Sequence, residues 1–131
     1  MAILKLLAYF WTLPNTFIGL FIGVGTLLSG GRAQFIRGAV EFHGGLARFL
    51  LIHCTMLEHG ASAITFGHVI CGRDQASLDF ARDHEHVHVR QYEKWGPFFI
   101  PAYLLASLII KLRGGNAYLD NPFEKEAYGN K

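Results

Sequence analysis

The stretch "RDHEHVHVRQYEKWGP", residues 82–97, decides the fold because its three alternating histidines fit either a strand or a helix. In a strand all three would share one face, whereas in a helix only His84 and His88 would do so. A stripe of positions in steps of three and four runs through this stretch, as a helix requires: Leu78, Ala81, Glu85, His88, Tyr92 and Trp95. No turn residue interrupts residues 77–95, and Gly96-Pro97 is a helix terminator, so the sequence predicts one helix.

The helical geometry gives the histidines a specific chemistry. At about 100° per residue, His84 and His88 lie about 40° apart around the helix, while His86 points the opposite way. The segment "HEHVH" then fits H-E-x-x-H, in which two imidazoles bind one zinc ion and the glutamate between them reaches the metal's water. We therefore predict zinc ligands at His84 and His88, and Glu85 as the general base that takes a proton from this water. The alternative is an amphipathic helix whose histidines are incidental.

A third protein ligand must come from outside this helix, and the acidic candidates downstream are Asp120, Glu124 and Glu126. The segment "DNPFEKEAY" predicts a helix, because Asn121 can cap it and Pro122 fits its first position. Glu124 stands at the capping-box position, where it would bond back to the backbone of Asn121 instead of binding metal. Glu126 lies about 200° around the helix from Glu124, so both cannot face one metal ion.

The amino-terminal region is the most apolar part of the chain. Residues 6–28, "LLAYFWTLPNTFIGLFIGVGTLL", carry no charge and match the roughly 20 residues that a membrane-crossing helix needs. Pro14 and Asn15 predict a kink or a restart within it. Gly19 and Gly23 form a small-xxx-small pair of the kind that lets membrane helices approach closely. We predict a membrane anchor; a buried hairpin of a soluble core is the main alternative, and a cleaved signal peptide would lack a clear A-x-A site.

The remaining segments predict short strands and one further apolar helix. They are a linker over residues 29–32, a strand over 39–45, a helix or strand over 46–59 that ends at Gly60, a strand over 62–72 and a helix over 97–115. The 131 residues suffice for one domain with a modest core, and a net charge of +2 gives no electrostatic reason to expect nucleic acid. Cys54 and Cys71 are too far apart for a C-x-x-C motif and do not make a disulfide scaffold.

A few other side chains have a functional and a structural interpretation. His68 could polarise a substrate carbonyl or join the metal, although a structural histidine on a half-buried strand is the simpler reading. His86 is expected to be exposed or to pair with a neighbouring acid, and Cys71 lacks a recognisable base that would make it a nucleophile. Gln91 could contact a ligand or the substrate, and the tyrosines near the predicted site are either oxyanion donors or core residues: Tyr92, Tyr103 and Tyr118.

The segment "HEHVHVRQYEKWGPFFIPAY" followed by "NPFEKEAY" resembles the gluzincin class of zinc metallopeptidases. It is most similar to small, poorly characterised bacterial domains with H-E-x-x-H-x-x-Q and a later N-P-x-E-x-E-A, and the resemblance covers roughly residues 62–128. It implies that Glu124 is the third zinc ligand, with Ala127 at the family's alanine position. Tyr128 stands where the family often has an aspartate that orients a zinc-bound histidine, and Asp83 or Asp120 would have to replace it. The resemblance also implies an edge strand, near residues 62–72, that pairs with extended substrate.

These observations predict a mainly helical α+β protein with a zincin-like active-site helix, a small β-sheet and an apolar membrane-type segment. Residues 1–31 would form the membrane anchor, and residues 32–131 a minimal zincin-like metal-binding domain. The expected location is membrane-associated, at the bacterial inner membrane given the resemblance, or cytoplasmic if the apolar segment is core.

The expected function is zinc-dependent hydrolysis of peptide bonds in a peptide or protein substrate. Glu85 would be the catalytic residue, and His84, His88 and Glu124 would hold Zn²⁺. The alternative is a non-catalytic zinc-binding protein associated with membrane lipid.

Overall fold

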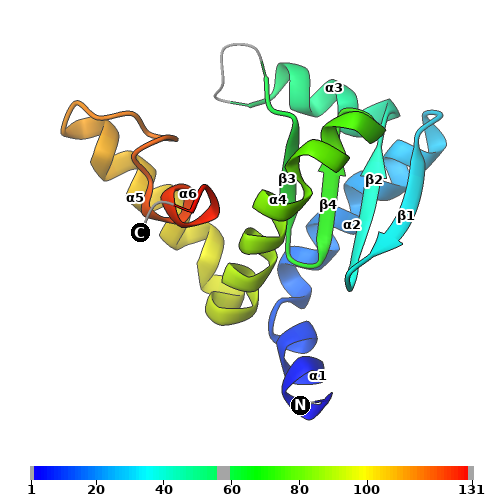
Figure 1. The fold of residues 1–131 in the computed structure, drawn as a ribbon, viewed down its shortest axis with the longest axis horizontal. Helices are drawn as coiled ribbons and strands as arrows, with labels where there is room; N and C mark the ends of the chain where they lie inside the picture. Colours follow the sequence, from blue (N-terminus) through cyan, green and yellow to red (C-terminus); the bar gives the residue numbers. More distant parts are fainter. Residues whose placement is uncertain (1, 56–59, 130–131) are drawn as a thin grey trace.

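A computed structural model describes residues 2–55 and 60–129 and places helices on both faces of a four-stranded sheet (Figure 1). The expected α+β class, mainly helical with a small sheet, is confirmed. In chain order the elements are α1 (Ala2–Trp11), α2 (Leu13–Leu28), β1 (Arg32–Ile36), β2 (Ala39–His43), α3 (Gly45–His53), β3 (Ala63–Phe66), β4 (Val69–Gly72), α4 (Gln75–Trp95), the short 3₁₀ helix η1 (Gly96–Phe98), α5 (Phe99–Leu112) and α6 (Pro122–Ala127).

The sheet is mixed, with strand order β1-β2-β4-β3. β2 pairs antiparallel with β1 and parallel with β4, and β4 pairs antiparallel with β3. The strand predicted over 39–45 is confirmed as β2, whereas the linker assigned to 29–32 includes the first residue of β1. The single strand predicted over 62–72 is wrong. Gly67 has a φ of +61° and reverses the chain, so this segment is the β3–β4 hairpin and leaves β3 at the sheet edge.

The two faces of the sheet are covered by different helices, each with its own apolar cluster. On one face α4 packs through Leu78 and Val89 against Ala39 and Ile70 of the sheet. On the other face α2 and α3 meet Phe42, Val69 and Cys71 in a cluster that includes Ala47 of α3. The helical alternative for residues 46–59 is thus correct through His53, and residues 56–59 lie outside the described part of the chain.

The amino-terminal apolar segment is two helices with a 67° bend between them, as Pro14 and Asn15 predict. Gly19 and Gly23 do not face another membrane helix but lie on the sheet. A Cβ atom on Gly19 would come within 2.5 Å of Val69, and one on Gly23 would collide with the ring of Phe42. These glycines therefore serve close packing of α2 inside the protein, and α2 forms one layer of the same core as the sheet.

The helix predicted through the histidines is α4, and it begins two residues earlier than the expected Ser77. Asp74 is its N-cap: the Asp74 carboxylate accepts a hydrogen bond of 2.8 Å from the backbone N–H of Ser77. Gly96, with a φ of +57°, ends it. A bidentate ion pair with the sheet fixes the position of α4, since Arg82 donates to both oxygens of the fully buried Glu41 of β2 at 2.9 and 3.0 Å.

The expectation that His86 is exposed is wrong. Only 6% of His86 is exposed, because it lies on the side of α4 that faces the β1–β2 hairpin, where the charges of Arg37 and Glu41 act on it. Among the described residues its Nε2 atom has no hydrogen-bond partner.

After α4 the chain turns through η1 into α5 and then returns through α6 to the histidines (Figure 1). The predicted second helix over 97–115 is confirmed as α5 but is shorter at both ends. Asn121 caps α6 as expected, accepting from the Phe123 N–H at 2.9 Å, and Pro122 occupies the first turn. The Asn121 side chain is fully buried and also donates to the Tyr103 carbonyl and to Ser107 of α5, so α6 is anchored on α5.

One helical run among the described residues, Gln75–Leu112, contains an 18-residue window that is apolar enough and long enough to cross a membrane, and 17% of this window is buried. The bent pair of α1 and α2 passes the same test when taken together. A core helix of a soluble protein can also pass this test.

Candidate metal centre

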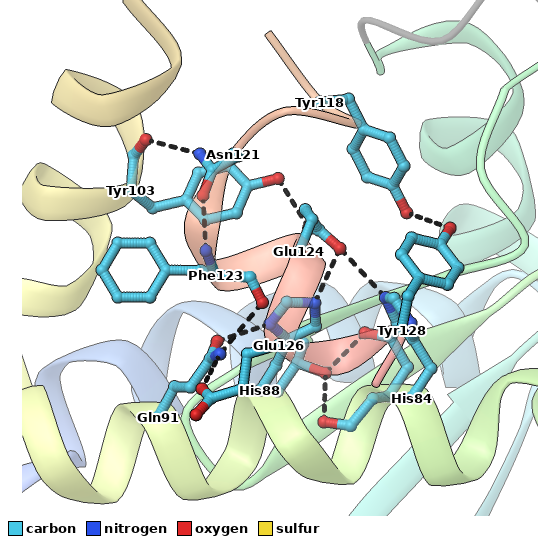
Figure 2. A network of polar contacts seen from close by, with 12 residues as sticks. His84, His88, Gln91, Tyr103, Tyr118, Asn121, Phe123, Glu124, Glu126 and Tyr128 are labelled. Atoms are coloured by element: carbon cyan, nitrogen blue, oxygen red, sulfur yellow. Dashed lines mark hydrogen bonds and ion pairs between the residues drawn. The ribbon is translucent and has the colours of Figure 1, made fainter. Parts of the chain in front are cut away.

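Two imidazoles of α4 and one carboxylate of α6 converge at one point (Figure 2). The ring centroids of His84 and His88 are 5.0 Å apart on the face of α4 that α6 covers. Glu124 Oε1 lies 3.0 Å from His84 Nε2 and 3.1 Å from His88 Nε2. The structure thus brings together the residues that sequence and resemblance select as ligands, across 36 to 40 positions of the chain.

These separations fit a metal site. Two ligand atoms that bind zinc tetrahedrally at 2.0–2.1 Å stand about 3.3 Å from each other. The 3.0 and 3.1 Å contacts, both made by Glu124 Oε1, are close to that value. Independently, the ligand atoms of His84, Glu85 and His88 lie within 4.8 Å of one another, so this group could hold a metal ion.

The tautomer of His88 strengthens this conclusion. Gln91 Nε2 donates to the Phe123 carbonyl at 3.0 Å and to Glu126 at 2.5 Å, so Gln91 Oε1 faces His88 and accepts from its Nδ1 at 2.8 Å. With the hydrogen on Nδ1, neutral His88 presents the lone pair of Nε2 to the Glu124 carboxylate. Two acceptors 3.1 Å apart repel each other unless a proton or a metal ion lies between them.

The shifted pKa values of His88 and Glu124 are those expected where a positive charge lies beside a carboxylate. Burial alone would lower the pKa of His88, but the hydrogen bond with Glu124 and the charges of Glu85 and Glu124 raise it to about 9. Burial alone would raise the pKa of Glu124, but the hydrogen bonds from His84 and His88 lower it to about 2. At neutral pH a proton on His88 therefore supplies the positive charge that a bound metal ion would replace.

Glu85 lies beside this point and is held from the sheet. Thr65 of the edge strand β3 donates to Glu85 Oε1 at 2.8 Å, and Glu85 Oε2 lies 3.9 Å from His84 Nε2. Burial raises the pKa of Glu85 above its ordinary value, although the charge of His88 and the Thr65 hydrogen bond oppose this rise. A carboxylate with a raised pKa is a stronger base than an exposed glutamate, as proton transfer from water requires.

Gln91 orients the ring of His88, a role that the sequence does not predict for it. Its carbonyl fixes the ring of His88, and its amide ties the same side chain to α6. Neither proposed substitute does this. Asp83 is an exposed partner of Arg37, and Asp120 accepts from the Asn116 N–H. The only local sequence signal for Gln91 is its spacing of three residues after His88, which places both on one helix face.

Tyr128 stands where the family that the chain resembles often has an aspartate, and it contacts a histidine through its ring instead of through a hydrogen bond. The ring of Tyr128 packs on His84 with centroids 4.3 Å apart (Figure 2). His84 Nδ1 has no hydrogen-bond partner in the described part of the chain. The orientation of His84 is therefore set by packing, whereas that of His88 is set by a hydrogen bond.

The three candidate oxyanion donors have separate roles. Tyr103 donates to Glu124 Oε2 at 2.6 Å, which turns the other oxygen toward the histidines. Tyr92 is buried and donates to the Thr65 carbonyl. Tyr118 lines the cavity described below, and its hydroxyl lies 2.8 Å from that of Tyr128.

A cavity of about 290 Å³ lies between the edge strand β3 and helix α5. Glu85, His88 and Glu124 are among its lining residues, so the cavity gives access to the convergence point. Its remaining walls are mostly apolar and include Ile64, Phe66, Phe99, Ile100 and Leu104. An apolar cleft with a few convergent polar groups is the usual form of a ligand site.

Other predicted candidates lie outside this cluster. His68 is in the β3–β4 turn, not on a strand; its Nδ1 lies 2.9 Å from Thr12 Oγ1 and its Nε2 lies 2.7 Å from Glu93 Oε2. It joins α1, the hairpin and α4, which is a structural role. Burial raises the pKa of the Cys71 thiol to about 12, and this group packs in the core instead of acting as a nucleophile.

Glu126 accepts from Gln91 and does not contact either histidine of the convergence point in the described structure. Comparison with protein-family models, with curated proteins and with solved structures finds no match to this chain.

Proposed function

We propose that this protein is a zincin-like, zinc-dependent metallopeptidase of minimal size, with His84, His88 and Glu124 as metal ligands and Glu85 as the general base. The observation that carries this proposal is the convergence of His84 Nε2 and His88 Nε2 on one oxygen of Glu124 at 3.0 and 3.1 Å, where a proton on His88 supplies the positive charge that a metal ion would replace. A set of two imidazoles and one carboxylate favours zinc among divalent ions. The resemblance to gluzincins supports the same assignment.

The proposed reaction uses residues in positions that suit each step. The carbonyl of an extended peptide would lie in the cavity beside β3, where a zinc ion held by His84, His88 and Glu124 would supply Lewis acidity to the carbonyl and to a water molecule. Glu85 accepts a proton from this water as its oxygen adds to the carbonyl carbon. The C–N bond then breaks, and Glu85 delivers the proton to the leaving amine. Thr65 keeps the Glu85 carboxylate in place throughout.

One observation favours the non-catalytic alternative, in which zinc serves only to clamp two helices. The Glu124 carboxylate already links α6 to α4 through both histidines, and α6 is a helix of 6 residues with little packing surface of its own. A metal ion at this place would stabilise the docking of the carboxyl-terminal segment without any reaction.

Metal content and hydrolysis measured on matched variants test the proposal. Wild-type protein is expected to retain about one zinc per chain, and His84→Ala and Glu124→Gln are expected to lose it. Glu85→Gln should keep the metal but lower the cleavage of quenched fluorescent peptides by roughly 10²–10⁴-fold. Asp83→Asn, which alters an exposed acid of the same helix, is the control and should change neither property.

The outcomes separate the two readings. Equal zinc in the wild type and in His84→Ala would remove both of them. Stoichiometric zinc without any cleavage across a peptide library would leave the structural clamp.

We also propose that the protein is associated with a membrane, at the bacterial inner membrane if the resemblance to bacterial domains holds. The uncharged run over residues 6–28 and the exposed apolar side chains of α1, α2 and α5 support this location. Recovery of the protein in the membrane fraction, and its release by detergent but not by alkaline carbonate, would be the expected result. Release by carbonate would contradict insertion of the apolar side chains into the lipid.

A further inference from the structure

The two faces of α2 make opposite contacts. Its inner stripe, Asn15, Gly19, Gly23 and Thr26, is buried against the rest of the protein. At about 100° per residue, the stripe made of Phe17, Phe21, Val24 and Leu28 lies almost diametrically opposite. All four of these side chains are exposed, with Phe21 at 80% and Leu28 at 85%. An exposed apolar face of this kind on a helix marks a surface that contacts another protein or a membrane.

The inner stripe is in contact with the domain along the full length of α2. Near its start Asn15 donates to the Gly96 carbonyl at 2.9 Å, and near its end Thr26 accepts from the Ala47 N–H at 3.1 Å. Between these points Gly19 and Gly23 lie on the sheet. Figure 1 shows α2 running behind the strands. The sheet therefore stays packed on the inner face of α2 in any environment that surrounds them.

This packing is incompatible with α2 crossing a bilayer. If α2 stood across the membrane, the edge strands β1 and β3 and the Glu41–Arg82 ion pair would enter the hydrocarbon with it. Open sheet edges do not occur in lipid, because their backbone groups have no partners there. The length agrees, since 16 residues at about 1.5 Å each give about 24 Å, short of the roughly 30 Å of hydrocarbon.

Helix α1 extends the apolar surface in a second direction. Its exposed residues Ile3, Leu6, Leu7 and Phe10 share one side, while Lys5 on the other side pairs with Glu93 of α4 at 2.6 Å. This helix is bent 67° from α2, so the two outer faces do not form one straight helical seam. Their apolar character is continuous through an uncharged sequence, which suits a fluid lipid surface better than a single complementary helix of a second copy.

We infer that α2 lies flat in the membrane interface, with the stripe Phe17, Phe21, Val24 and Leu28 buried in lipid and the sheet above it, so that the chain is attached to one leaflet and does not span. The cavity at the metal centre lies on the α4 side of the sheet, and α2 covers the opposite face. The inference refines the proposed membrane location and is independent of the proposed metal chemistry.

Flotation of the purified full-length protein with phosphatidylcholine/phosphatidylglycerol vesicles tests the lipid contact. The double substitution Phe21→Ser/Leu28→Ser is expected to weaken binding at least about tenfold, since two large apolar side chains leave the lipid. Phe80→Ser is the matched control, because Phe80 is 87% exposed on α4, and it should float like the wild type. Wild-type protein that stays monomeric and does not float would overturn the inference. So would a wild type that does not float and self-associates through the stripe.

Topology distinguishes a flat helix from a spanning one without any substitution in α2. The full chain, with one short epitope at the amino end and another inserted at Gly30 just after α2, is expressed in bacteria, and protease is added to sealed inverted inner-membrane vesicles. Both epitopes should be cleaved together or protected together. One cleaved and one protected epitope would mean that the chain crosses the membrane, and the inference would be wrong even if metal binding were intact.

Discussion

Replacing Gln91 by leucine is expected to weaken zinc binding by about 10- to 100-fold while leaving all proposed ligands in place. Leucine is similar in size but cannot accept the hydrogen bond from His88 Nδ1, which measures 2.8 Å, nor donate to the Phe123 carbonyl at 3.0 Å. The ring of His88 then loses the contact that fixes its orientation and its tautomer, and α6, which carries Glu124, loses a tie to α4.

The magnitude follows from the number of contacts removed. A 10- to 100-fold change in affinity corresponds to about 1.4–2.7 kcal/mol. Stability of the metal-free protein should also fall by roughly 2–3 kcal/mol, because a buried ring nitrogen and a carbonyl are left without partners. The two effects are measured separately: affinity by competition with a chromophoric zinc chelator, and stability by urea unfolding after metal removal.

A pair of further variants sharpens the test. Gln91→Glu keeps an acceptor for His88 but places two acids together, since Glu126 is the other partner of this side chain at 2.5 Å. Adding Glu126→Gln restores a donor between the two positions and should recover part of the stability. Gln75→Leu, at a surface glutamine bonded to Asp79, is the control. Wild-type zinc affinity in Gln91→Leu would refute the reasoning, because the orientation of His88 would then not depend on this contact.

Two more measurements follow from the same site. In chelator-treated protein, His88 with its pKa of about 9 against an ordinary 6.5 stabilises the fold below about pH 6.5, and this contribution is lost as the pH rises toward 9. The pKa of Glu124 is about 2 against an ordinary 4.5, so Glu124 stabilises the fold above about pH 4.5, and this contribution is lost as the pH falls toward 2. The urea midpoint of unfolding should therefore be highest between about pH 4.5 and pH 6.5, and the Glu124→Gln protein should lack this maximum. Asn121→Asp keeps the cap on the Phe123 N–H but loses the donation to the Tyr103 carbonyl and buries a charge, which should cost about 2 kcal/mol or more in urea unfolding; an unchanged midpoint would mean that α6 docks without this anchor.

Local patterns account for the elements that were predicted correctly. The stripe through Leu78 and Tyr92 fixed α4 because a 21-residue helix repeats its period many times. Pro14 marked the bend between the first two helices, and Asn121 with Pro122 marked the start of α6, since each residue restricts the backbone at its own position.

The errors share a different physical origin, namely contacts between distant segments. The sequence predicts one strand in place of the β3–β4 hairpin because Gly67 and His68 are not a common hairpin pair. In the structure Thr16 of α2 holds the turn, since its hydroxyl accepts from the His68 N–H. The burial of His86 and the role of Gln91 depend on where the sheet and α6 come to lie, which the sequence near these residues does not record.

The position of α2 as a layer of the core has a consequence for the order of events on the ribosome. Residues 13–28 emerge before β4, the strand that receives Gly19, which is completed only at Gly72. Until then both apolar faces of the nascent helix are unprotected, and the parallel pairing of β2 with β4 across an intervening helix is slow to form. Synthesis close to a bilayer or a chaperone would shield this intermediate.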